Sequence, residues 1–246
     1  MKKIICLAGM LFLVPALASA LSPEEIIDRV DRNEVFSTIR YRGIMTIQKG
    51  EGRQPRVKEF KAAAKGRDRA FIEFTNTGDR GTKYLKLKDE LWIKGAYAEE
   101  ATRISGHLLR QNMMGSDYSY EDVVSNEKLL DLYSAKLAGI EELAGRECYR
   151  LELAAKAKQV AYARQTVWVD AQEFVARKVQ YFALSGQLLK ELTVLETRKI
   201  GDRFFPVSIR MENKRHQNTY TLFEMKSVEL DAPVDDGVFS KRQLEK

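Results

Sequence analysis

The chain has 246 residues, with 41 lysines and arginines against 35 aspartates and glutamates, and a formal net charge of +6. With 44% hydrophobic and 31% charged residues, it has the composition of a folded globular protein and not that of a disordered chain. The small positive excess would suit contact with an anionic lipid surface but does not indicate a nucleic-acid-binding protein.

Residues 1–20 have the pattern of a secretory signal peptide. Lys2 and Lys3 precede an apolar run from position 4 to 17, and Ala18-Ser19-Ala20 matches a cleavage site. An N-terminal membrane anchor is the alternative, but the run is short for a hydrocarbon core of about 30 Å. We therefore expect a mature, secreted chain that forms one domain over residues 21–246.

The mature chain begins with a predicted amphipathic helix. Ser22 is a suitable N-cap, Pro23 suits the first helical position, and Glu25 completes a capping box. Apolar residues at Ile26, Ile27 and Val30 fall on one face, which predicts that this face packs on the core.

Period-two alternation then dominates the chain and predicts roughly ten antiparallel strands joined by short hairpins, a sheet long enough to curl into a barrel or half-barrel. Pro206 favours an edge strand or a bulge in its segment. Residues 103–143 interrupt the alternation, and short helices are predicted at 120–124 and 125–137. The predicted strand segments are 38–50, 56–66, 68–75, 83–95 (two strands), 147–156, 164–170, 174–183, 187–200, 203–213 and 218–230.

Motifs for catalysis, metals or cofactors are not evident. His107 and His216 are far apart in the sequence, and no zinc-ligand spacing, nucleophile elbow or phosphate loop occurs. We therefore predict no metal and no cofactor. After removal of Cys6, Cys148 could form no internal disulfide, and its alternating surroundings favour a buried structural thiol over a reactive one.

The segment "QNMMGSDYSYEDVV" (111–124) concentrates acids and could be a site. A calcium loop is disfavoured because tyrosines take the alternate ligand positions. Hydrolysis by paired carboxylates is disfavoured because Glu121 and Asp122 are neighbours and point in different directions on a helix. A helix start fits better. Gly115 would allow a sharp entry, and either Ser116 or Asp117, or Ser119 paired with Asp122, could cap the helix.

The apolar strand faces mix large flexible residues, such as Met45 and Phe60, with small ones such as Ala62. This mixture of residue sizes is typical of a filled core. It is also typical of a roomy cavity in a large barrel, because methionine lines such cavities well. The pattern by itself leaves both possibilities open.

Three stretches resemble one family. They are "LWIKG" from Leu91 with "TRISGHLLRQN" from Thr102, the central "MGSDYSYEDV" from Met114, and "PVDDGVFSKRQL" from Pro233. Together with the signal peptide and the long sheet, they resemble the LolA/LolB-like family, in its outer-membrane lipoprotein-sorting branch. A departure is that the chain lacks the proline common in that branch after the tryptophan strand.

The resemblance implies a mainly β fold with helices (α+β), an unclosed antiparallel barrel of about ten strands with a helical lid over a hydrophobic cavity. It implies a periplasmic, non-enzymatic carrier of the acyl chains of lipoproteins or other lipids, with a membrane transporter or an outer-membrane acceptor as partner. The residues expected at the cavity and lid are Met45, Ile47, Phe60, Ile72, Phe74, Leu85, Trp92, Met113, Met114, Tyr118, Tyr120, Val207, Ile209, Met211 and Phe223, with Gly115, Ser116, Asp117, Glu121 and Asp122 as the structural motif.

Two other functions remain open at this point. The same fold could sense lipids or dock on a transporter without moving cargo, and a hydrolase could use Asp117 and Glu121. The sequence does not specify the cargo, the membrane partner or the oligomeric state.

Overall fold

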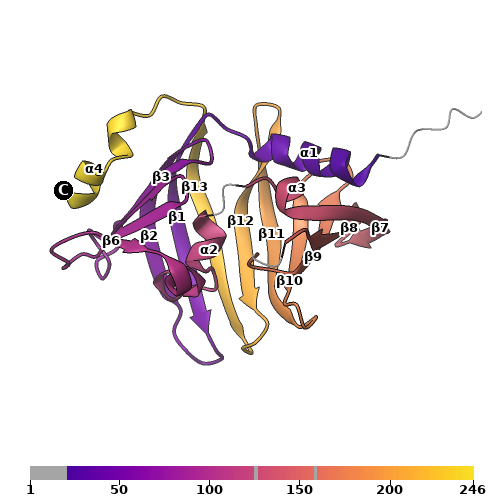
Figure 1. The fold of residues 1–246 in the computed structure, drawn as a ribbon, viewed down its shortest axis with the longest axis horizontal. Helices are drawn as coiled ribbons and strands as arrows, with labels where there is room; N and C mark the ends of the chain where they lie inside the picture. The colour runs from indigo at the N-terminus through magenta and orange to yellow at the C-terminus, as the bar shows by residue number, and fades with distance from the viewer. Residues whose placement is uncertain (1–20, 125–126, 158–159) are drawn as a thin grey trace, which may run out of the picture.

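One antiparallel sheet makes up most of the part of the chain that the computed structural model describes, residues 21–124, 127–157 and 160–246. The predicted signal peptide lies outside the described residues. Within them the sheet has thirteen strands (Figure 1). They are β1 (Thr38–Lys49), β2 (Arg56–Lys65), β3 (Arg69–Phe74), β4 (Lys83–Leu87), β5 (Glu90–Lys94), β6 (Thr102–Ile104), β7 (Tyr133–Leu143), β8 (Arg146–Ala155), β9 (Arg164–Asp170), β10 (Ala176–Phe182), β11 (Leu188–Ile200), β12 (Arg203–Asn213) and β13 (Thr219–Leu230).

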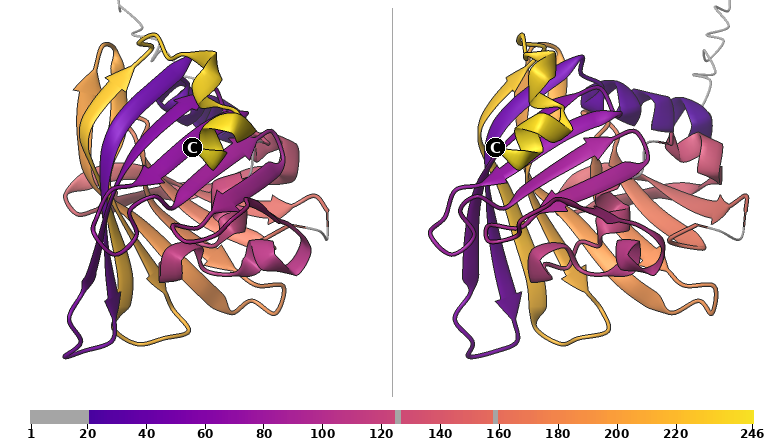
Figure 2. Two further views of the ribbon diagram at one scale, coloured as in Figure 1. Left: turned by 90° about the vertical axis from the view of Figure 1, so that its left-hand side faces the viewer. Right: turned by 60° about the vertical axis from the view of Figure 1, so that its left-hand side comes forward.

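The strand order is β6-β5-β4-β3-β2-β1-β13-β12-β11-β10-β9-β8-β7, so the first and last strands pair in the middle of the sheet. The two edge strands, β6 and β7, are successive in the chain. Their connection must therefore run from one edge to the other, across the open side of a strongly curved sheet (Figure 2). We call β1–β6 the first half of the sheet and β7–β13 the second half.

The helices are short and lie outside the sheet. The capping box predicted at Ser22 and Glu25 forms at the start of α1, and Ile26 and Ile27 are buried against the second half. The helices are α1 (Pro23–Glu34), α2 (Tyr120–Val124), α3 (Leu129–Leu132) and α4 (Lys241–Glu245), with 3-10 turns η1 (Gly106–Arg110), η2 (Met113–Gly115) and η3 (Asp236–Val238).

The sequence-based expectation of about ten strands is wrong, because it lacked β6 and β7. With three residues, β6 is too short to show a period. The helix predicted over 125–137 is also wrong beyond Leu132, and its first two residues lie outside the described part. From Tyr133 the chain is extended, with Tyr133, Ala135 and Leu137 packed on the second-half core, since pairing with β8 outweighs the local helical pattern.

Pro206 lies in the central strand β12, at a bulge. Register shifts occur in β11 on both sides of Glu196, next to the Thr197–Pro206 pair. The described pairing of β12 with β13 begins only at Ser208, so the missing N–H of proline interrupts no ladder hydrogen bond there. The bulge alternative predicted for this segment is confirmed.

The two faces of the first half are both covered. On the convex face, Phe71 and Leu85 pack with Phe239 and Leu244 from the C-terminal segment. On the concave face, a second cluster includes Phe60, whose ring lies where a Cβ on Gly43 would come within 2.2 Å of it. The absence of a side chain at Gly43 therefore leaves the room that this aromatic core needs.

Candidate functional site

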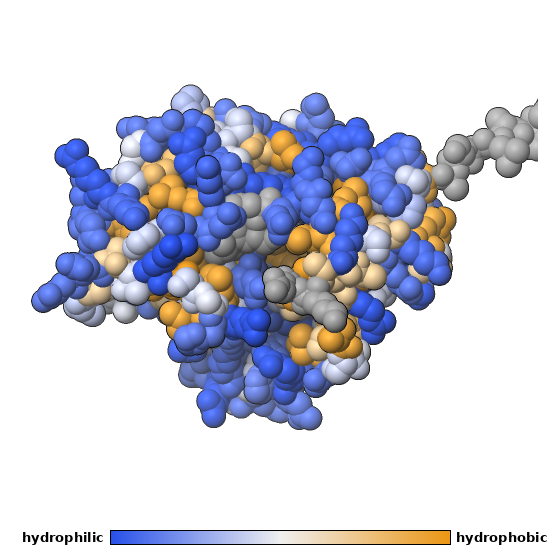
Figure 3. All heavy atoms as spheres, viewed as in Figure 1, coloured by the Kyte–Doolittle hydropathy of each residue, from blue (hydrophilic) through white to orange (hydrophobic). Residues whose placement is uncertain are grey.

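A cavity of about 1150 Å³ lies inside the curve of the sheet. Strands of the second half form its floor, α1 and α3 flank it, and residues 105–124, here called the crossing segment, border it on the other side. Apolar side chains are exposed on both sides of the middle of this face of the molecule (Figure 3). The lining includes Ile27 and Val30 from α1, Leu129 and Leu132 from α3, Val167, Val169, Val179, Leu192, Ile209 and Met211 from the strands, and Leu109, Tyr118 and Val123 from the crossing segment.

The crossing segment folds back on itself in a small loop. Asn112 and Ser119 form an isolated antiparallel bridge, closed by the N–H of Met113 on the carbonyl of Tyr118 at 2.8 Å. Met114 (φ 52°) and Gly115 (φ 73°) both take left-handed backbone conformations at the tip. A Cβ on Gly115 would also lie 2.9 Å from Nη2 of Arg56, so this position suits glycine for two reasons.

Asp117 anchors this loop to the middle of the sheet. Its carboxylate is 1% exposed and accepts hydrogen bonds from Lys49 Nζ of β1 at 2.9 Å and from the hydroxyl of Thr221 in β13 at 2.7 Å. The N–H of Asp117 donates to the same Thr221 oxygen at 2.9 Å. One sequence-based alternative had Asp117 as the N-cap of the helix. That alternative is wrong, because both carboxylate oxygens of Asp117 are engaged in contacts with the sheet.

Asp122 anchors α2 to the second half. The N–H of Ser119 donates to Asp122 Oδ2 at 2.7 Å, and the N–H of Asp122 donates to Ser119 Oγ at 3.3 Å, which is the capping box predicted for this pair. The same carboxylate accepts from Lys190 Nζ of β11 at 2.7 Å and from the Tyr162 hydroxyl at 2.6 Å. The crossing segment is thus clamped to the sheet at two points.

Tyrosine hydroxyls surround the second anchor. Tyr162 and Tyr181 have ring centroids 4.6 Å apart, and both line the cavity together with Tyr118. Burial, followed by the nearby Asp122 carboxylate, raises the pKa of each of the three phenols well above its ordinary value. They are therefore neutral hydroxyl groups in a lining that is mainly apolar.

The residues expected at the site fall into four groups. Tyr118, Ile209 and Met211 line the cavity. Leu85 and Trp92 belong to the convex-face cluster. Val207 packs with Ile39 in a separate small cluster. The remainder pack together on the concave face of the first half: Met45, Ile47, Phe60, Ile72, Phe74, Met113, Met114, Tyr120 and Phe223.

The cavity also has lining residues that sequence reasoning did not propose, chiefly in α1, α3 and strands β9 to β11. The stripe of Ile27 and Val30 was predicted to pack on the core, and the alternation of Val167 and Val169 predicted a strand face. These patterns mark apolar surfaces but do not say which surface stays uncovered. From periodicity alone, these residues could have been predicted only as members of the core and not as the lining of a cavity.

Among the described residues, no group of three or more histidine, cysteine or acidic side chains is placed to hold a metal ion. Cys148 is buried in β8, and that burial raises the pKa of its thiol. Within residues 21–124, 127–157 and 160–246, the helices all lack the length and apolar character needed to cross a bilayer.

Comparison with solved structures identifies the fold. A DUF1329 family protein from Desulfovibrio piger is 25% identical, with a TM-score of 0.82, and the match covers 91% of this chain and 100% of that one. An outer membrane lipoprotein-sorting protein domain from Vibrio parahaemolyticus is 21% identical, with a TM-score of 0.80, over 92% and 98% of the two chains. A LolA superfamily protein from Nitrosomonas europaea is 18% identical, with a TM-score of 0.74, over 91% and 100%.

Sequence comparison adds a family. No curated protein matches the chain. A protein-family model with the description "-like: Uncharacterized protein" matches residues 66–246, well over half of the chain. This match shows that the chain belongs to the family of that model, and the fold that it shares with these solved structures agrees with its resemblance to the LolA/LolB-like family.

Proposed function

We propose that the protein is a non-enzymatic periplasmic carrier that binds the acyl chains of lipoproteins or other lipids in the cavity of the second half. The observation that carries the proposal is the size and lining of that cavity. At about 1150 Å³ it is larger than the roughly 300–1,000 Å³ typical of small-molecule pockets. Its walls are mainly aliphatic and aromatic, which suits long hydrocarbon chains.

Burial of hydrocarbon would drive binding. Each methylene group removed from water contributes about 0.8 kcal/mol before the cost of ordering the chain. The walls supply flexible groups, such as Met211 and Leu192, that adapt to chains of different shape. The hydroxyls of Tyr118, Tyr162 and Tyr181 would meet the more polar, ester-bearing part of a ligand.

We further propose that the crossing segment is the helical lid of this carrier. Its two clamps fix it at separate places, Asp117 to the junction of the halves at β1 and β13 and Asp122 to β11 of the second half, so loosening either clamp would change access to the cavity. In the closed arrangement Tyr118 and Val123 would contact the ligand. The aromatic cluster of the first half would become accessible only if the segment lifted.

Names of similar proteins support the cellular role. The Vibrio parahaemolyticus domain is described as an outer membrane lipoprotein-sorting protein, and the Nitrosomonas europaea protein as a LolA superfamily protein. By analogy we propose export by a cleaved signal peptide (residues 1–20), a single lipid-binding domain (21–246), and an outer-membrane acceptor or a membrane transporter as partner.

The test is mass spectrometry of lipids extracted from protein purified from the periplasm. We expect acyl-bearing molecules that co-purify in near-stoichiometric amounts and that transfer between donor and acceptor vesicles when the protein is added. Protein that is free of lipid and has no affinity for fluorescent acyl probes would overturn the proposal. Binding without transfer would favour the alternative, a lipid-sensing or transporter-docking module.

A further inference from the structure

A lysine of the first half reaches into the cavity beneath the crossing segment. Lys86 lies on β4 between Ala70 of β3 and Leu91 of β5, both apolar. It is 6% exposed and lines both the large cavity and a small gap under Val123. A charged side chain in such a place requires a partner, because burial of an uncompensated ammonium is costly.

The partner that the structure offers is weak. Within the described residues, the hydrogen bond recorded for the ammonium is the one that Nζ donates to the carbonyl of Val123 at 3.4 Å, which is long for an N–H to oxygen contact. Burial lowers the pKa of Lys86 to about 8, although Asp68 and Asp89 on the flanking turns act to raise it. The acids nearby therefore do not compensate the burial of this cation.

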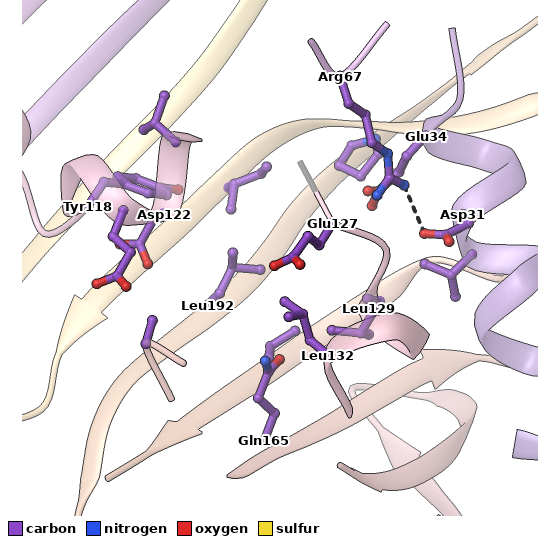
Figure 4. A pocket seen from close by; sticks show the side chains of 18 of the residues that line it. Asp31, Glu34, Arg67, Tyr118, Asp122, Glu127, Leu129, Leu132, Gln165 and Leu192 are labelled. Carbon is purple, nitrogen blue, oxygen red and sulfur yellow. Dashed lines mark hydrogen bonds and ion pairs between the residues drawn. The ribbon is translucent and has the colours of Figure 1, made fainter. Parts of the chain in front are cut away.

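Other charges line the same cavity from the surrounding elements. Figure 4 shows Arg67 paired with Asp31 of α1, at 3.1 Å, with Glu34 beside them and Glu127 directed inward. From α2, Glu121 also lines the cavity, whereas the Asp122 carboxylate is held by Lys190 and Tyr162. Arg67 lowers the pKa of Lys86 by repulsion. Among the described residues, Lys86 thus has no carboxylate in ion-pair contact, and it lies next to a space that fits acyl chains.

We propose that Lys86 binds the anionic group of the ligand, a carboxylate or a phosphate, while the acyl chain extends into the apolar second half. The inference rests on the proposed function and specifies its ligand class as lipids with a negatively charged group close to the hydrocarbon. An ammonium at this depth makes a charge-assisted hydrogen bond that water screens little. The long contact with Val123 is the bond that a bound anion would replace.

The experiment compares dansyl-labelled undecanoic acid with its methyl ester, which lacks the charge and carries one more methyl group, in fluorescence titrations of the full mature protein. We expect the acid to bind roughly tenfold more tightly than the ester, the ratio typical of one hydrogen bond to a charged group. In Lys86→Met the acid should lose this advantage while the ester keeps its affinity. Lys86→Arg, which retains the charge, should retain most of the preference.

Lys83→Met is the matched control. Lys83 lies on the same strand and is similarly buried, at 9% exposed, but the alternation of β4 directs it to the face opposite Lys86. This variant should leave both affinities unchanged. Circular dichroism and thermal melts check that each variant is folded, and the acid-to-ester ratio of the unmodified protein is informative even if Lys86→Met does not fold.

A second arm separates the two sources of negative charge. Displacement of the bound probe by a short-chain phosphatidic acid, compared with the diacylglycerol of the same chains, tests phosphate recognition. The inference predicts stronger displacement by the phosphatidic acid in the unmodified protein and equal displacement in Lys86→Met.

The possible failures are distinguishable. Equal affinity for acid and ester, together with equal displacement by the two lipids, would overturn the role of Lys86 and leave the carrier intact. Equal weakening of acid and ester in Lys86→Met would also overturn it, because that result indicates a purely structural contact with the crossing segment. Absence of binding by every probe would instead overturn the carrier function.

Discussion

The two halves of the sheet have the same alternating apolar pattern, but the first half forms a packed core and the second half borders a cavity. In the first half, the rings of Phe60, Phe74 and Tyr84 follow one another at centroid distances of 5.4 and 6.0 Å, and Tyr120 of the crossing segment continues the series at 6.0 Å. In the second half, the strands are lined by smaller branched side chains such as Val167 and Val179, and the cavity lies over them.

The difference shows how a covering segment decides what a strand face does. Large aromatic residues meet the crossing segment and fill the space beneath it. Valines and leucines are too small to reach the same cover, so a space remains between them and the clamped segment. An apolar face becomes core where its side chains reach the covering element, and cavity wall where they do not.

The largest expected effect tests the packing of the first half of the sheet. Phe74→Ala should lower the free energy of unfolding by about 3–5 kcal/mol, because the ring is only 1% exposed and its removal would leave a cavity in an aromatic cluster. Chemical denaturation measures this loss, while the affinity of the folded protein for the acyl probe should stay within about twofold. A tenfold loss of affinity in folded protein would instead place Phe74 in the ligand site.

The next effect concerns the clamp between the halves. Asp117→Asn should lower the free energy of unfolding by about 2–3 kcal/mol, because it removes the charge from a buried carboxylate that holds Lys49 and Thr221. The control is Asp236→Asn, whose carboxylate pairs with Lys65 at the surface and should have no measurable effect. Similar small losses in both variants would show that Asp117 does not anchor the segment.

A pH series tests the lysine at the boundary of the halves. The folded-state pKa of Lys86, about 8, is below its ordinary value of 10.5, so between the two values the unfolded chain binds more protons. The stability of the unmodified protein relative to Lys86→Met should therefore rise by about 2 kcal/mol between about pH 7 and pH 10.

Urea denaturation of both proteins at each pH measures that rise. Over the same range the preference for the acid probe should fade as the ammonium of Lys86 loses its proton. Stability curves that run parallel for the two proteins would show that Lys86 is not desolvated as the structure indicates.

The smallest expected effect tests the cavity over the second half of the sheet. Leu192→Arg should weaken acyl-probe binding about tenfold, which corresponds to about 1.4 kcal/mol, because a long charged side chain would occupy the wall of the cavity. Leu195→Arg is the control on the same strand, since Leu195 is 54% exposed and lies away from the cavity. If both variants bind alike, the cavity of the second half does not hold the acyl chain.

The sequence predicted local features well. The capping boxes at Ser22 and at Ser119 with Asp122 formed as expected, because they depend on residues three positions apart. The bulge at Pro206 follows from the missing N–H of proline. Strand β7 was missed because Leu129, Leu130 and Leu132 give a helical pattern immediately before it, and the pairing with β8 that fixes its conformation is not local.

The candidate site was predicted less completely, for a related reason. Tyr118, Ile209 and Met211 line the cavity, whereas Phe60 and Phe74, which have the same alternation, are packed under the crossing segment. Lys86 appeared only as the polar member of an alternating strand, and nothing in its neighbours predicted burial. The acids at positions 117 and 122 were interpreted as helix-start devices, and Asp117 proved to be a clamp to strands far away in the sequence.

The sequence by itself determined the alternating faces, the helix caps and the family resemblance, because each depends on residue types at short, fixed spacings. The tertiary structure decided that the first and last strands pair, which places both sheet edges in the middle of the chain and draws residues 105–124 across the open side. It thereby decided which apolar face is filled and which is left open. That choice depends on the distance between elements that pairing brings together, and no local spacing contains it.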